Sequence, residues 1–97
     1  MPTITDDPDI QILEDVQPEL DQPWNVIVFD DPVNYMGFVA MVIRRVFGYS
    51  QEKAETLMLQ VHEKGKSIVW SGVQEKAEFY VQQLQGYHLN ASMQKPS

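Results

Sequence analysis

Cysteine is absent from this 97-residue chain, so neither disulfides nor thiol chemistry are available to it. It has only two histidines, and it contains no glycine-rich phosphate loop and no pair of histidines at metal-binding spacing. Its apolar runs fall far short of the roughly 20 residues that a membrane-crossing helix needs. We expect no signal peptide, because its first residues lack a basic region followed by an apolar stretch. We expect one small cytoplasmic domain that is not an enzyme, holds no metal or cofactor and does not enter a membrane.

Basic residues are missing from the first 22 positions, which hold seven of the fourteen acids. From Pro23 onward seven acids balance seven bases, so the rest of the chain has no basic excess for binding nucleic acid. The first segment also has three prolines and no aromatic residue. We therefore expect residues 1–22 to be a flexible acidic extension and residues 23–97 to be the core domain. Composition leaves open whether the extension only aids solubility or engages a partner.

Helical periodicity and runs of aromatic and β-branched residues predict six elements after Pro23. Strands are expected at 24–29, 66–72 and 87–93, and helices at 35–47, 51–64 and 74–84. Asn34 and Ser50 are the expected N-caps of the first two helices. A glycine suited to the left-handed conformation ends each helix, at Gly48, Gly65 and Gly86. The order β-α-α-β-α-β predicts an α+β fold with three helices on one face of a three-stranded antiparallel sheet.

Each predicted helix carries an apolar stripe that we expect to face the sheet. In the first helix the stripe comprises Met36, Val39, Ala40, Ile43, Val46 and Phe47. In the second it comprises Ala54, Leu57, Met58, Val61 and His62, and in the third Ala77, Phe79, Tyr80, Val81 and Leu84.

Two neighbouring carboxylates, Asp30 and Asp31, stand where the first strand stops. Turn chemistry explains one of them, because Asp accepts backbone hydrogen bonds in turns. A second adjacent acid adds like-charge repulsion, which a bound cation would relieve. A turn and a cation-binding role are both open.

His62 continues the apolar stripe of the second helix. A lone histidine in such a stripe is usually a hydrogen-bonded core residue. Alternatively, it lines one cavity with the two aspartates and apolar side chains such as Met36 and Met58. A hydrolase or metal enzyme built on a carboxylate and this histidine is a distant alternative, because no clear nucleophile or further ligand accompanies them.

The segments "WNVIVF" (24–29), "DDPVNYMGFV" (30–39) and "LMLQVHEKGKSIV" (57–69) resemble the ClpS adaptor family of the actinobacterial type. The similarity covers residues 23–93, and the family fold has the same order of elements. ClpS proteins bind N-degrons, which are amino-terminal degradation signals of proteins whose first residue is Leu, Phe, Trp or Tyr. They pass this cargo to a Clp AAA+ unfoldase coupled to the ClpP peptidase. The resemblance thus implies a non-enzymatic adaptor whose partners are N-degron proteins and the N-terminal domain of ClpC or ClpA. A monomer is the default expectation for its oligomeric state.

The resemblance also implies roles for individual residues. Asp30, Asp31 and His62 match positions that hold the α-amino group of the cargo. The matching pocket for its first side chain comprises Asn34, Met36, Val39, Met58, Val61 and Leu89. Glu75 and Tyr80 match contacts with the unfoldase, and the extension becomes an arm that engages the unfoldase during delivery.

Three positions depart from the family pattern. Asp30 stands where Asn is common, Pro32 where many members have Asp, and Tyr80 where other members carry Lys. The main alternative function is a protein-interaction module related to the C-terminal domain of ribosomal L7/L12, with no pocket for an amino terminus.

Overall fold

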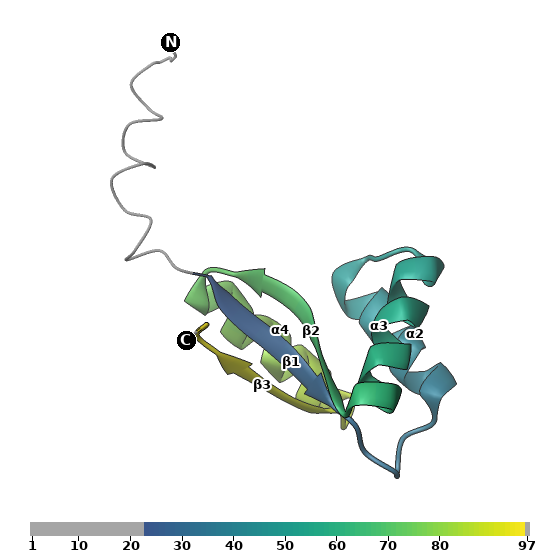
Figure 1. Ribbon diagram of the computed structural model, residues 1–97. Helices are drawn as coiled ribbons and strands as arrows, with labels where there is room; N and C mark the ends of the chain where they lie inside the picture. Colours follow the sequence, from purple (N-terminus) through teal and green to yellow (C-terminus); the bar gives the residue numbers. More distant parts are fainter. Residues whose placement is uncertain (1–22, 97) are drawn as a thin grey trace, which may run out of the picture.

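Six elements follow one another in the predicted order in a computed structural model that describes residues 23–96. They are β1 (Trp24–Phe29), α2 (Met36–Phe47), α3 (Gln51–Lys64), β2 (Lys66–Gly72), α4 (Gln74–Gly86) and β3 (Asn90–Gln94), shown in Figure 1. The α+β class and the β-α-α-β-α-β order are confirmed. The predicted extension, residues 1–22, lies outside the described residues.

The sheet has the order β2-β1-β3, and β1 pairs antiparallel with both neighbours. Because side chains alternate along a strand, Val26 and Val28 share one face. Both are buried in a core cluster that includes residues of all three helices, so the helices share this face, as predicted. In Figure 1, α4 lies behind the sheet, and α2 and α3 stand together at the end where β1 finishes.

A β-bulge interrupts the pairing of β1 with β2. Val26 is opposite Trp70 while Ile27 is opposite Ile68, so Val69 is the extra residue. Val69 is buried, and its carbonyl accepts a hydrogen bond of 2.8 Å from the Tyr49 hydroxyl. Ile68 points to the other face and is 52% exposed. The bulge thus directs two consecutive large residues, Val69 and Trp70, towards the helices.

The ends of α2 and α3 largely follow the sequence. Ser50 Oγ accepts a hydrogen bond of 3.1 Å from the backbone N–H of Lys53, which confirms it as an N-cap. Gly48 and Gly65 take the left-handed conformation, with φ of 73° and 88°. The prediction for Asn34 was wrong: Tyr35 occupies the N-cap position without a side-chain bond, and the Asn34 amide bonds elsewhere.

The end of α4 also differs from the prediction. Gly86 does not stop the helix but is its last residue. His88, with φ of 68°, takes the left-handed conformation instead. The helix therefore runs two residues beyond 84, and β3 begins at Asn90 rather than at residue 87. The chain reverses between α4 and β3 at a non-glycine residue, which sequence pattern alone does not indicate.

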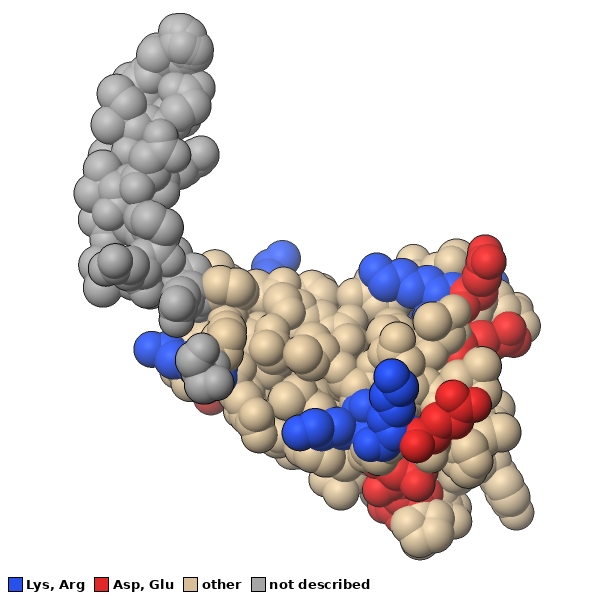
Figure 2. Space-filling view, in the orientation of Figure 1, with Lys and Arg blue, Asp and Glu red and all other residues tan. Residues whose placement is uncertain are grey.

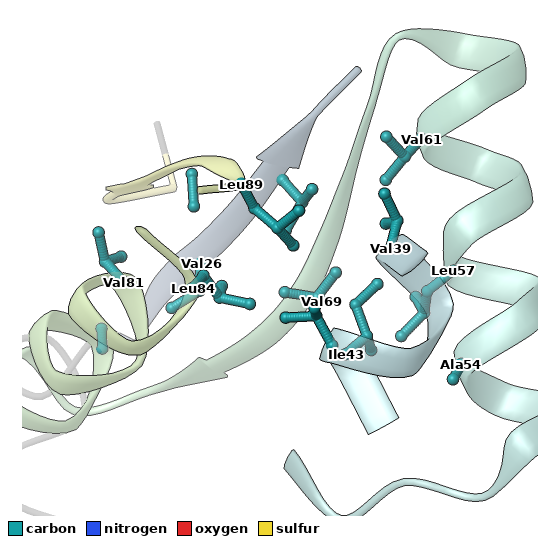
Figure 3. Packing of buried hydrophobic residues seen from close by; sticks show 14 residues of the cluster. Val26, Val39, Ile43, Ala54, Leu57, Val61, Val69, Val81, Leu84 and Leu89 are labelled. Atoms are coloured by element: carbon teal, nitrogen blue, oxygen red, sulfur yellow. The ribbon is translucent and has the colours of Figure 1, made fainter. Parts of the chain in front are cut away.

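The predicted stripes were right in their centres and wrong at several margins. Val42, which the predicted stripe does not include, is fully buried because α2 packs against both α3 and α4 and so buries a wider face. Met36 and Phe79 are 42% and 54% exposed. Figure 3 shows the resulting cluster, in which α2 and α3 meet the sheet residues.

Candidate functional site

Three chain segments meet where β1 ends. The loop 30–35 is joined to the end of α3 by a hydrogen bond of 2.9 Å from the Asp30 backbone N–H to the Gly65 carbonyl. It is joined to the α4–β3 turn by a bond of 3.2 Å from the Asn34 side-chain amide to the His88 carbonyl. These two bonds hold the loop between segments that are distant in sequence. Neither carbonyl partner was predicted, because a backbone acceptor leaves no residue-type signal.

Asp31 forms a turn with its own neighbours. Its Oδ1 accepts a hydrogen bond of 3.0 Å from the Val33 N–H, and its carbonyl accepts one of 3.0 Å from the Asn34 N–H. Turn chemistry therefore applies to Asp31, the half-buried member of the pair. The Asp30 side chain is exposed. A carboxylate accepts about four hydrogen bonds, so the turn leaves Asp31 with acceptor capacity for a ligand.

His62 is exposed in the last turn of α3, which excludes the hydrogen-bonded core histidine, one of the two roles that the sequence left open. It directly follows the buried Val61, and one residue along a helix is a rotation of about 100°, which turns its side chain away from the core. Gly65 follows His62 by three residues, and its carbonyl accepts a hydrogen bond from the Asp30 N–H. The histidine and the acidic loop thus occupy the same end of the fold.

The apolar residues predicted for the pocket divide into a buried and an exposed group. Val39, Val61 and Leu89 are buried members of the core cluster, and Val39 and Val61 lie near each other in Figure 3. Met58 is half-buried and precedes His62 by four residues, one helical turn. Met36, at the start of α2, is exposed. Three of the predicted pocket residues therefore belong to the core, whereas the two methionines are accessible to solvent.

The structure does not place all of these side chains around one open cavity. A hollow of about 210 Å³ lies between α2 and α3, and Met58 is its one member from the predicted pocket. Its other lining residues include Gly37, Ala40 and Met41. Across residues 23–96, no three histidines or acids are grouped in a way that could hold a metal ion.

Glu75 and Tyr80 lie away from the acidic loop, on α4. Glu75 is exposed in the first turn of α4. This helix begins just after β2 ends at Gly72, and Gly72 pairs with Trp24 at the start of β1. Asp30 follows the other end of β1, and a six-residue strand spans about 20 Å. The two predicted binding regions therefore lie at opposite ends of the sheet.

Tyr80 belongs to a group of packed aromatic rings and is half-buried. Its ring centroid is 4.7 Å from that of Phe47, 4.8 Å from that of Trp70 and 5.5 Å from that of Phe79. Burial, and secondarily the neighbouring Tyr80, raises the pKa of Tyr49, whose ring stacks on Phe47. Tyr80 thus has a packing role that a lysine at this position would not fill.

Comparison with known proteins gives consistent results. The profile of the family described as "ATP-dependent Clp protease adaptor protein ClpS" matches residues 19–95. The ClpS adapter protein of Streptomyces avermitilis is 50% identical over 78 residues, which are 80% of this chain and 74% of the relative. That of Corynebacterium aurimucosum is 44% identical over 94 residues, 97% of this chain and 85% of the relative.

A solved structure supports the fold. It is described as that of Agrobacterium tumefaciens ClpS2 bound to L-phenylalaninamide, and it superposes with a TM-score of 0.72. The match covers 78% of this chain and 99% of that one, at 20% sequence identity. At this identity the likeness concerns the arrangement of helices and strands.

Proposed function

This chain belongs to the ClpS family of ATP-dependent Clp protease adaptors, and from that premise we propose that it recognises proteins by a free amino terminus followed by a large apolar side chain. Cargo of this kind begins with Leu, Phe, Trp or Tyr. The adaptor delivers it, without catalysing a reaction itself, to a Clp AAA+ unfoldase that feeds ClpP. The observation that supports this best is the hydrogen bond between Asp30 and Gly65, which fixes the acidic loop beside the end of α3 that carries His62.

The amino terminus of the cargo would bind to acceptors at this end of the fold. An α-ammonium group carries three N–H donors, and Asp30 and Asp31 supply carboxylate oxygens. His62 can supply a third acceptor when the ring nitrogen that faces the ligand is unprotonated. The position of His62 in solvent suits this role, because the ring has no place in the core.

The first side chain of the cargo would rest on an apolar base. Val39, Val61 and Leu89 supply its floor, and Met36 and Met58 its adjustable sides, because methionine adapts its shape to different apolar groups. Asn34, held by the His88 carbonyl, would lie beside the cargo backbone. A relative bound to L-phenylalaninamide supports a ligand that combines a free amine with a large apolar side chain.

The unfoldase would bind the opposite end of the sheet. Glu75 and the neighbourhood of Tyr80 are our proposed contacts for the N-terminal domain of ClpC or ClpA. Cargo and unfoldase can then bind one monomeric adaptor together, because about 20 Å of sheet separates them. Residues 1–22 precede β1 at this same end, which fits their proposed role as an arm engaged during delivery.

Calorimetric titration with a Leu-first peptide and its N-acetylated twin tests the proposal. We expect the free peptide to bind and the acetylated one to lose at least tenfold in affinity, because acetylation removes the charge and donors that the carboxylates need. Equal affinity of the two peptides would contradict recognition of the amino terminus. Binding of neither peptide would favour the interaction module that resembles the C-terminal domain of L7/L12.

A further inference from the structure

A hollow of about 550 Å³ lies over the face of the sheet opposite the core cluster, and Gln60 and Lys64 of α3 complete its lining at one end. It extends along β1 from Asn25 to the neighbourhood of Lys66, which pairs with Phe29. Its floor includes Ile27 and the half-exposed Ile68. In Figure 1 this face is turned to the viewer, and none of the described helices crosses it.

Lysines flank this hollow at both ends. Lys64 and Lys66 border it where β1 finishes, and Lys95 borders it where β1 begins. Lys95 Nζ lies 5.6 Å from the centre of the Trp24 ring. The hollow thus holds three of the seven basic residues of the chain and no acid among its lining residues. Figure 2 shows the viewed face: uncharged surface separates the basic side chains at its left edge from those at its lower centre, and acidic side chains adjoin the latter group.

We propose that the acidic segment 1–22 of this same chain docks in this hollow. The segment has seven acids and no base, so its charge is complementary to the three lysines. The stretch "IQILEDV" (10–16) combines apolar residues that can cover the exposed Ile68 with Glu14 and Asp15, which can approach the lysines.

The connection to β1 makes this contact easy to reach. Gln22 precedes Pro23 and Trp24, so the segment enters the domain at the end of the hollow that Lys95 borders. Five residues of β1 span about 17 Å, whereas 22 extended residues span about 73 Å. The segment can therefore reverse its direction and still cover the whole hollow. Because tethering raises the effective concentration of the segment, weak contacts suffice. Docking here and engagement by an unfoldase exclude each other, so the hollow would hold the arm until delivery.

Paramagnetic relaxation enhancement in the full-length protein tests this docking without cargo or unfoldase. The chain has no cysteine, so Gln11→Cys gives one site for a nitroxide label. We expect the amide signals of Ile27 and Ile68 on the open face to weaken more than those of Val81 and Leu84 on α4. At 1 M salt, where the Debye length is about 3 Å, this preference should fade. Equal weakening of both faces at low salt would overturn the proposal.

Two sets of lysine and arginine substitutions provide the matched comparison. Lys64→Gln, Lys66→Gln and Lys95→Gln together should abolish the open-face preference. The control variant, with Arg45→Gln, Lys53→Gln and Lys76→Gln, loses the same charge outside the hollow and should retain the open-face preference. An equal difference in signal weakening between the two faces in both triple variants would contradict a role for the hollow. A mixed sample identifies the occupant of the hollow. In it, one set of copies carries the nitroxide and no isotope label, and the other carries ¹⁵N and no nitroxide. Weakening of the open-face signals of the ¹⁵N-labelled copies would show that the segment of a second molecule fills the hollow, and would overturn intramolecular docking.

Discussion

The side-chain amide of Asn34 donates a hydrogen bond of 3.2 Å to the carbonyl of His88, a residue 54 positions later in the chain. His88 has a φ of 68°, in the left-handed region that non-glycine residues rarely adopt. The bond connects the acidic loop to the turn before Leu89, so it joins the proposed amino-group site to the base of the proposed side-chain pocket. The Asn34 side chain does not cap α2, and this hydrogen bond is its structural role instead.

Replacing Asn34 with Ala should loosen this connection. We expect a loss of about 0.5–1.5 kcal/mol in the free energy of unfolding, the usual net value of one hydrogen bond. The affinity for Leu-first peptides should fall as well, because the loop no longer has a fixed position. Urea unfolding and calorimetric titration measure the two effects, with the exposed Gln82→Ala as a control. Unchanged peptide affinity would show that the connection is not part of the site.

Two substitutions of Asp30 separate the contribution of its carboxylate as a hydrogen-bond acceptor from its contribution as a negative charge. Asp30→Asn should still bind Leu-first peptides, with a weaker dependence on salt. Free α-amino groups titrate at about 7.7–8.0, so this variant should also lose affinity at a lower pH as the pH rises. Asp30→Ala should lose about 1.5–3 kcal/mol of binding free energy. Titrations across pH and salt measure these differences, and if both variants matched the parent, Asp30 would have no part in binding.

His62 is exposed, so its removal should affect binding and leave the fold intact. His62→Ala should lower the affinity for Leu-first peptides about tenfold or more, the usual effect of one lost hydrogen bond to a charged group. The free energy of unfolding from urea titration should stay within about 0.5 kcal/mol of the parent, as expected for a surface position. Circular dichroism and peptide titration on the same sample measure both. A large loss of stability would instead assign His62 a structural role.

Met36 should restrict which first residues the site accepts. It is exposed at the start of α2, three residues before the buried Val39. A β-branched first residue is wide near its backbone, where Leu and Phe are still narrow, so Met36 would obstruct Ile and Val. Met36→Ala should therefore bind Val-first peptides while retaining Leu-first ones. Competition titrations with the two peptides test this, and a variant that discriminates against Val as strongly as the parent would refute it.

The hydrogen bond from Tyr49 to the Val69 carbonyl should contribute to stability in a pH-dependent way. Tyr49→Phe removes it, which should cost about 0.5–1.5 kcal/mol near neutral pH. Burial raises the pKa of Tyr49 above 10.0. A raised pKa means that the stabilisation by the neutral phenol is complete below pH 10 and is lost as the pH rises through the folded-state value. The variant should therefore lose less stability than the parent above pH 10.

The control for Tyr49 is the exposed Tyr35, which is 83% accessible to solvent. Tyr35→Phe should leave both the neutral and the alkaline unfolding curves unchanged. Urea unfolding of the parent and both variants from pH 7 to pH 11 measures the comparison. If Tyr49→Phe and the parent declined alike above pH 10, titration of Tyr49 would not contribute to the alkaline loss.

The amino-acid sequence by itself determined the order of the elements and most of their bounds. The aromatic and β-branched residues of β1 and the periods near 3.6 in α2 and α3 are local properties. Gly48 and Gly65 end their helices through their own freedom at positive φ. The resemblance to ClpS proteins also rests on contiguous segments, and the family match over residues 19–95 confirmed it. All of this information lies within a few neighbouring residues.

Only the tertiary structure decided which side chains those elements bury and which distant groups they bring together. Val42 is buried because α2 packs against two helices at once, and His62 is exposed although it continues an apolar stripe. The partners of the acidic loop, Gly65 and His88, are backbone carbonyls that carry no residue-type signal. Such contacts join residues tens of positions apart, and their geometry depends on how whole elements pack. Local periodicity therefore predicts the helices and strands, whereas the assembled fold decides the geometry of the site.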